Sequence, residues 1–485
     1  MRVPRWLVFL VLLFLAVVGF AHLDADFPNH SRWIDDAAKF TDEGWWASSA
    51  IRHTLNGHWI APHDYNPGVV LPLWPVLLSV LFHLTGISAI AARALAFSFT
   101  IGTVLVCGAV MAKRDPSLRW PTMLLIASSP SLYFFSRLSI LEPALVFFLV
   151  ATAWAAYSKQ APAVLRLLLC GVLYTLAMLT KTSAVFLLPA FAILLWLPQR
   201  ALWGMGATQR RRALLALLIP ATTFAVCYGI YWLKVIHTHP IEVGIFYKGA
   251  GGGLRLESAR KAVRVVYRCF TWVDAIAYPA TVLALIALAR RSRIPWQDPL
   301  FSFAILFFLG QSAFMVVRFT AEPHYFAVLS VPLMMIALLL LEPLKLAIPR
   351  AHAAMAAALL LTAVVNLFYI AKLEAHPEYS LRDACRAIQQ RIASEPDASP
   401  LVIGHGSIET SLFTGLAALD DLGNESMDDK LRTEHPGWVV SWNNEAMAFQ
   451  DPAVQRDFVF EPQGRFPALD GSVRNALLLY RIRPR

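Results

Sequence analysis

The sequence predicts a mainly α-helical, polytopic membrane protein of about eleven transmembrane helices, followed by a small extracytoplasmic α/β domain. The chain has 485 residues, of which 57% are hydrophobic and only 15% are charged. Its mean hydropathy is +0.55, outside the range of soluble globular proteins. The apolar residues form long runs up to residue 371, after which the composition changes to that of a soluble domain.

Eleven apolar runs have the length of membrane-spanning helices: 6–21, 88–112, 120–136, 143–158, 165–181, 182–198, 213–235, 270–289, 299–318, 325–341 and 351–371. The first could also be a signal peptide. It lacks a small-x-small cleavage site near its end, so we expect an uncleaved span. A further run, 69–86, contains Pro72 and Pro75. These prolines favour a juxtamembrane or re-entrant helix, although a span is left open.

Basic residues gather in alternate segments between these runs. The segments hold 16 Lys and Arg but three acids, Asp115, Asp298 and Glu342. The positive-inside rule places such segments in the cytoplasm. We therefore expect a multi-pass protein of the cytoplasmic (inner) membrane, with the N-terminus inside and the C-terminal domain in the periplasmic or extracellular space. The net charge of +10 follows from this orientation, and no nucleic-acid partner is expected.

This topology divides the chain into a transmembrane domain, 1–371, and a soluble extracytoplasmic domain, 372–485. The first includes a periplasmic loop with juxtamembrane helices, 22–87, and a basic periplasmic loop, 236–269. The second holds 12 basic and 17 acidic residues, with short apolar runs between turns, as in a small mixed α/β domain. The five cysteines show neither metal-binding spacing nor a disulfide framework.

Ionisable residues at or near the ends of the apolar runs all fall toward the outer face in this topology. Charge near hydrocarbon favours a functional role, although long side chains at helix ends also extend to the interface. The one-sided distribution of the set favours a polar cavity at the outer face. The residues are Arg93, Arg137, Glu142, Lys181, Lys234, Asp274, Arg318, Glu322 and His324.

The basic loop contains an amphipathic stretch, 257–270. Arg260, Arg264 and Arg268 are four residues apart, which places them on one face of a helix. A basic helix of this kind binds anionic head groups at the membrane surface. Its ligand is equally a substrate phosphate or an ordinary anionic lipid.

Asp42 and Glu43 open a second amphipathic stretch, which ends at Asn56-Gly57. Acids are common in the first turn of any helix because the helix dipole stabilises them. Adjacent helical positions point about 100° apart, so the two carboxylates should have different roles.

The order of several motifs resembles the GT-C glycosyltransferases of the protein O-mannosyltransferase and aminoarabinose-transferase type. The resemblance covers about residues 1–371, and the tail resembles the family only in being an extracytoplasmic C-terminal domain. The motifs are the outside Asp-Glu in FTDEGWW (40–46), NPGVVLPLWPVLL (66–78), the Arg93 span, SRLSILEPALVFF (136–148), GVLYTLAMLTKTSAVFLLP (171–189) and EPHYFAVLSVPL (322–333). This chain departs from the family by having Asn66-Pro67-Gly68 in place of a proline pair.

The resemblance implies an inverting hexosyl- or pentosyltransferase that moves a sugar from a polyprenyl-phosphate carrier to a glycan, lipid or protein acceptor outside the membrane. Asp42 matches the family's catalytic base, Glu43 its acidic neighbour and Glu142 its second acidic position. The implied phosphate-binding residues are Arg137, Lys181, Arg260, Arg264, Arg318, His324 and Tyr325. No cofactor is expected, a metal is optional, and the other partners are membrane lipids.

Two other functions stay open on the sequence. A transporter or lipid-linked-sugar flippase would use charged groups without covalent chemistry, but such proteins place these groups near the membrane midplane in related repeats. This chain shows one-sided charges and no evident repeat. An assembly protein whose tail binds a partner is the third possibility.

Overall fold

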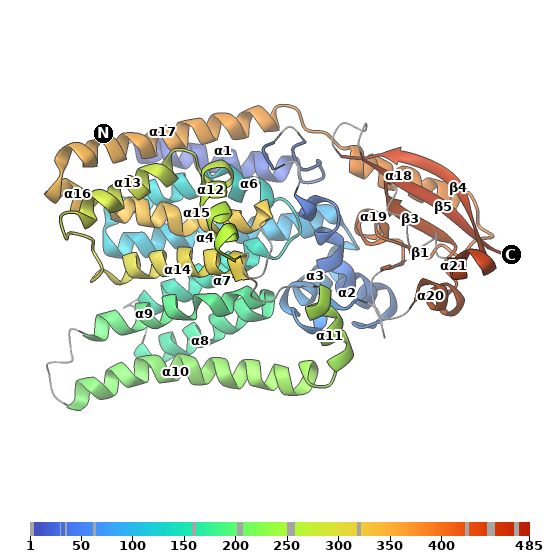
Figure 1. Ribbon diagram of the computed structural model, residues 1–485, viewed down its shortest axis with the longest axis horizontal. Helices are drawn as coiled ribbons and strands as arrows, with labels where there is room; N and C mark the ends of the chain where they lie inside the picture. The colour runs from blue at the N-terminus through green and yellow to red at the C-terminus, as the bar shows by residue number, and fades with distance from the viewer. Residues whose placement is uncertain are drawn as a thin grey trace.

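The computed structural model describes residues 4–29, 31–33, 36–61, 65–157, 162–200, 207–249, 258–317, 322–421, 426–443, 452–469 and 475–485. An elongated bundle of helices stands at one side and a small domain built on a β-sheet at the other (Figure 1). Helices α2 (Asp42–Asn56) and α3 (Leu73–Thr85) of the first loop lie between the two. The first loop therefore joins the membrane part to the C-terminal domain.

Most of the other helices of the bundle lie within the predicted apolar runs. They are α1 (Arg5–Ala21), α4 (Ala89–Arg114), α5 (Arg119–Ala127), α6 (Pro130–Phe135), α7 (Glu142–Tyr157), α8 (Ala163–Thr180), α9 (Leu188–Arg200), α10 (Ala207–Tyr231), α11 (Pro240–Gly249), α12 (Ser258–Arg268), α13 (Ala277–Ala289), α14 (Pro299–Val317), α15 (Pro323–Leu339), α16 (Leu341–Ala347) and α17 (Pro349–Glu374).

Six helical stretches of the described residues are long and apolar enough to cross a membrane: Ala89–Arg114, Ala163–Thr180, Leu214–Ile236, Pro299–Val317, Pro323–Ala347 and Pro349–Glu374. Shorter apolar helices are Arg5–Ala21, Leu73–Thr85, Glu142–Tyr157, Thr182–Trp196 and Ala277–Ala289. The polytopic helical class is confirmed, and the count of eleven spans stays a prediction.

The run 120–136 differs from the continuous span that its hydropathy predicts. It forms two short helices, α5 and α6, because Pro130 lacks an amide hydrogen and holds Ser129 in an extended conformation. Every residue of α6 is buried, and the segment 136–141 that follows it is buried too. The break therefore brings polar backbone into the bundle next to the start of α7.

The C-terminal domain is a small mixed α/β unit, as the tail composition predicts. Its strand order is β2-β1-β3-β5-β4, with β1, β2 and β3 parallel and β5 antiparallel to both β3 and β4. The strands are β1 (Val402–Ile403), β2 (Ala418–Leu419), β3 (Trp438–Trp442), β4 (Phe458–Pro467) and β5 (Ala476–Pro484). The helices are α18 (Ser380–Ala393), α19 (Ser407–Thr414), α20 (Met427–Glu434) and α21 (Pro452–Asp457).

Strand β3 is the centre of this domain because all five of its residues are buried. Trp438, Val440 and Trp442 pack with residues of α18 and α19. Val439 points to the other face and packs with Leu431 of α20 and Val454 of α21. The alternation of side chains along a strand thus gives the sheet a helical layer on each face.

The first loop is fixed to the bundle by a buried ion pair between Glu43 and Arg93. Arg93 Nε and Nη2 donate to the two Glu43 carboxylate oxygens at 2.8 and 2.5 Å, and both residues are 2% exposed. Arg93 Nη1 also donates to the carbonyls of Leu23 and Ala25 at 2.8 and 2.7 Å. The backbone amide of Ser139 donates to Glu43 at 2.7 Å. One guanidinium therefore joins α4, the start of the loop and α2.

We expect Arg93→Ala to lower the free energy of unfolding by about 3–5 kcal/mol, because it leaves the Glu43 carboxylate buried and unpaired. Arg114→Ala is the matched control on the same helix. Arg114 pairs with Asp298 and Glu342, but its side chain is 37% exposed, so its loss should cost about 1 kcal/mol or less. Denaturant unfolding in detergent, followed by tryptophan fluorescence, measures both. Equal losses would contradict the role given to the buried pair.

Candidate active site

Asp42 is the first residue of α2, and Thr41 precedes it at the N-cap position. Its side chain is 14% exposed and faces the His324 imidazole, with Asp42 Oδ2 3.8 Å from His324 Nε2. Glu43, the next residue, is engaged with Arg93. The two adjacent carboxylates therefore have different partners, as the helical geometry predicts.

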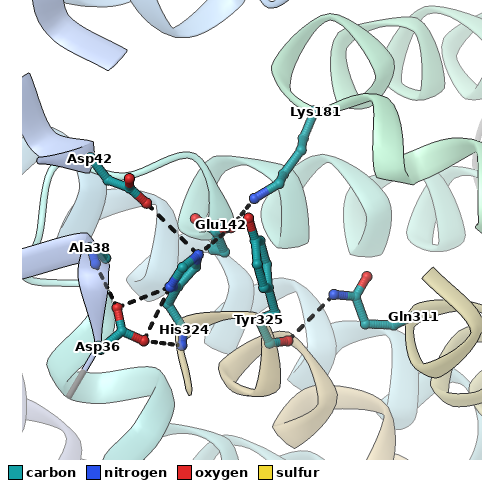
Figure 2. Close-up of polar contacts among 8 residues, drawn as sticks. All are labelled: Asp36, Ala38, Asp42, Glu142, Lys181, Gln311, His324 and Tyr325. Carbon is teal, nitrogen blue, oxygen red and sulfur yellow. Dashed lines mark hydrogen bonds and ion pairs between the residues drawn. The ribbon is translucent and has the colours of Figure 1, made fainter. Parts of the chain in front are cut away.

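His324 is held by Asp36, which is fully buried in the first loop. Asp36 accepts from His324 Nδ1 at 3.0 Å and from the His324 backbone amide at 2.8 Å. The amide of Ala38 donates to the same carboxylate at 2.7 Å. Because Nδ1 of His324 is hydrogen-bonded to Asp36, Nε2 on the other side of the ring points to Asp42 and Glu142 (Figure 2). Within the part of the chain that the structure describes, this Nε2 has no hydrogen-bond partner.

Glu142 and Lys181 form the other half of the site. Glu142 begins α7, directly after the buried segment 136–141. Lys181 is the C-cap of α8, in an extended conformation that ends the helix. Lys181 Nζ pairs with Glu142 and lies 4.2 Å from the centre of the Tyr325 ring. Glu142 is in turn 3.9 Å from His324 Nε2, so the two halves are joined (Figure 2).

The environment of Asp42 favours its protonated form more than water does. Burial raises the pKa of its carboxyl from an ordinary value of 3.8 to about 6. His324 and Lys181 oppose this change, whereas the carboxylates of Glu142 and Asp36 add to it. A carboxylate with a pKa near 6 is a stronger base than an exposed aspartate and still ionised at neutral pH.

The structure brings five of the expected site residues together: Asp42, Glu142, Lys181, His324 and Tyr325. They come from α2, α7, the end of α8 and the start of α15, and they meet at the end of the bundle nearest the C-terminal domain (Figure 1). The grouping of charge at one end agrees with the one-sided distribution expected from the sequence.

Other expected residues lie elsewhere. Glu43 is bound to Arg93. Arg137 pairs with Glu374 and donates to the carbonyl of His22, beside a cavity of about 520 Å³ between the first loop and the end of α17. Arg260 and Arg264 are exposed on α12, and Arg318 lies outside the described residues.

Asp36 is the site residue that sequence reasoning missed. Neither a motif nor a periodic pattern surrounds this residue in the chain. The structure buries it completely against the backbone of His324, 288 positions away. Such a long-range contact leaves no local signal in the chain.

The fold of this chain is of the GT-C type. Two crystal structures of ArnT from Cupriavidus metallidurans, one bound to undecaprenyl phosphate and one in the apo state, each match with a TM-score of 0.58 over 97% of both chains at 14% identity. The Archaeoglobus fulgidus oligosaccharyltransferase in the apo form covers 94% of this chain and 73% of its own, at 14% identity and a TM-score of 0.47. No protein-family model matches the sequence, and no curated protein matches it significantly. At this identity the likeness is one of fold.

We expect the Asp42 carboxyl to titrate with a midpoint near pH 6. Infrared difference spectra of the protein in detergent, recorded against Asp42→Asn, isolate the carboxyl band of this residue. The protonated band should be lost as the pH rises through 6, because burial holds the proton longer than water does. A midpoint near 3.8, the ordinary value, would mean that the side chain is solvated.

Proposed function

We propose that this protein is a glycosyltransferase of the cytoplasmic membrane that moves a sugar from a polyprenyl-phosphate carrier to an acceptor hydroxyl on the outer side. The observation on which this proposal chiefly rests is the placement of Asp42 against His324 and the Lys181–Glu142 pair. The fold adds support, since a protein of the same architecture binds undecaprenyl phosphate.

Asp42 is suited to be the base. The acceptor hydroxyl loses its proton to the Asp42 carboxylate as its oxygen attacks the anomeric carbon. The bond between that carbon and the carrier phosphate breaks, and its electron pair leaves with the phosphate. Attack from the face opposite the phosphate inverts the anomeric centre.

Lys181 and His324 are suited to stabilise the leaving phosphate. The phosphate gains negative charge as it departs, and fixed positive groups in a partly buried site lower the energy of that state. Glu142 holds Lys181 in place, and Asp36 orients the His324 ring so that Nε2 is presented to the site. Tyr325 packs against both Lys181 and His324, which keeps these groups from moving apart.

The proposed topology places this chemistry outside the cytoplasm. The site and the C-terminal domain lie at the same end of the bundle (Figure 1). The basic segments that predict the cytoplasmic side, such as Lys113 to Arg119, occur at the opposite ends of the helices. The acceptor would then be a glycan, lipid or protein of the cell envelope.

We expect Asp42→Asn to lower sugar transfer by about 10²–10⁴-fold, the usual contribution of a general base. The assay uses nanodiscs made with total membrane lipid from cells fed a radiolabelled sugar. Transfer is measured as the movement of radiolabel from the lipid-linked sugar, which mild acid releases, to the product, which is stable to mild acid. The rate of the unaltered protein should also fall about tenfold per pH unit below 6, as Asp42 becomes protonated.

The amide variant keeps the shape of the side chain, so its thermal unfolding should be close to that of the unaltered protein. Asp115→Asn, a change at an exposed acid directly after α4, serves as the control and should transfer normally. Full transfer by Asp42→Asn would remove the base from the mechanism and favour a transporter.

We expect Lys181→Ala to weaken the binding of undecaprenyl phosphate by about 10–100-fold. A hydrogen bond to a charged group contributes roughly 1.5–3 kcal/mol, and about 1.4 kcal/mol equals a factor of ten. Tryptophan fluorescence titration with undecaprenyl phosphate in detergent measures the dissociation constant.

Lys234→Ala removes an exposed lysine from the outer end of the helix that begins with α10 and is the matched control. Equal weakening in both variants would mean that the lysines act only through general surface charge. Unchanged binding in Lys181→Ala would exclude this residue from the phosphate site.

A further inference from the structure

The C-terminal domain contacts the first turn of α2, where Asp42 lies. Glu409 of α19 is 2% exposed, and one of its carboxyl oxygens, Oε1, accepts from the backbone amide of Gly44 at 3.1 Å. Gly44 is the third residue of α2, so its amide is one of the helix-end donors that lack a partner within the helix. A side chain from a separate domain thus caps the helix that begins with Asp42.

The close approach of the two helices depends on glycine. A Cβ atom at Gly44 would lie 2.7 Å from the Glu409 backbone nitrogen and 2.7 Å from Glu409 Oε1. The first of these atoms belongs to the backbone of α19 and cannot rotate away. Any larger residue at position 44 would therefore push the two helices apart.

The C-terminal domain makes a second contact with the chain just before Asp42. The indole Nε1 of Trp442, at the end of β3, donates to the carbonyl of Phe40 at 2.9 Å. The rings of Phe40 and Trp442 also pack edge to face, with centroids 5.3 Å apart. The C-terminal domain therefore holds the segment 40–44 at both ends, with Asp42 in the middle.

The chemistry of Glu409 suits this position. Burial raises the pKa of its carboxyl well above the usual range, which favours the neutral form. A neutral carboxyl accepts the Gly44 hydrogen bond without adding a negative charge beside Asp42 and Glu43. Its other oxygen, Oε2, is buried without a hydrogen-bond partner among the described residues, an arrangement that costs stability.

We propose that Glu409 is a positioning residue, through which the C-terminal domain holds the first turn of α2 so that Asp42 faces His324 and Glu142. This inference rests on the proposed function for its catalytic consequence. It makes the C-terminal domain a part of the active site, in addition to any role in choosing the acceptor.

The direct test is the titration of Asp42, which requires no activity. In Glu409→Ala the first turn of α2 loses its cap, Asp42 becomes more exposed, and its infrared midpoint should shift from about 6 toward the ordinary carboxyl range. Glu409→Gln keeps a side-chain oxygen of the same reach and should restore the midpoint. Each spectrum is recorded against the same variant carrying Asp42→Asn, so the band of Glu409 itself cancels.

Two further variants serve as a second test and as a control for this titration. Gly44→Ala should shift the midpoint in the same direction, because it separates α2 from α19. Glu461→Ala removes an acid from β4 whose partner is Arg483, and it should leave Asp42 unchanged. An Asp42 midpoint that stays near 6 in Glu409→Ala, whatever the loss in thermal stability, would overturn the proposal.

Transfer kinetics give the catalytic consequence. Glu409→Ala should lower kcat by about 10–100-fold, the effect expected from misplacing a reacting group, with KM for the lipid-linked donor unchanged. Glu409→Gln should recover most of this loss. A kcat in Glu409→Ala that falls only in proportion to the folded fraction would contradict positioning. Full transfer by Asp42→Asn would instead refute the proposed function, while the infrared midpoint would still decide whether Glu409 positions Asp42.

Discussion

The arrangement of the site depends on the buried pair between Glu43 and Arg93. This guanidinium makes four hydrogen bonds, two to Glu43 and two to the carbonyls of Leu23 and Ala25. It therefore fixes the position of α2 relative to α4 independently of the contacts of Asp42. Replacing a buried pair by apolar residues is often neutral for stability, so the main contribution of this pair is orientation. Because Glu43 points to Arg93, its neighbour Asp42 is left to face α15.

The charged groups of the site have two kinds of role: some hold other side chains in place, and Asp42 is left to react with the substrate. Asp36 and Glu142 each bind a cationic side chain, His324 and Lys181 respectively. These contacts direct the positive groups toward Asp42, whose own carboxylate has no direct hydrogen bond to them and lies 3.8 Å from His324. A carboxylate that makes no such bond among the described residues can accept a proton from a substrate. The C-terminal domain constrains the position of Asp42 further, because it contacts Gly44 and Phe40 on either side of this residue.

Much of the fold follows from patterns that are local in the chain. Apolar runs of about twenty residues predict the helices, and the change in composition after residue 371 predicts the α/β domain. The prediction was wrong at 120–136, where Pro130 breaks a run that hydropathy alone joins. For the site, the ordered motifs predict Asp42, Glu142, Lys181, His324 and Tyr325, five residues that the structure brings together. They did not identify Asp36 or Glu409, because neither residue stands in a distinctive local pattern.

The sequence by itself determined the class of protein, the helical runs, the expected orientation and the set of charged residues from which a site could form. These features depend on hydropathy, charge and spacing within short segments. The tertiary structure alone decided which charges meet. It paired Glu43 with Arg93 and Arg137 with Glu374. It also brought the Asp36 carboxylate to the His324 backbone amide and Glu409 to the amide of Gly44, 365 positions away. The physical reason is that burial and distance fix the partner of a buried charge, and both arise only when distant segments pack together.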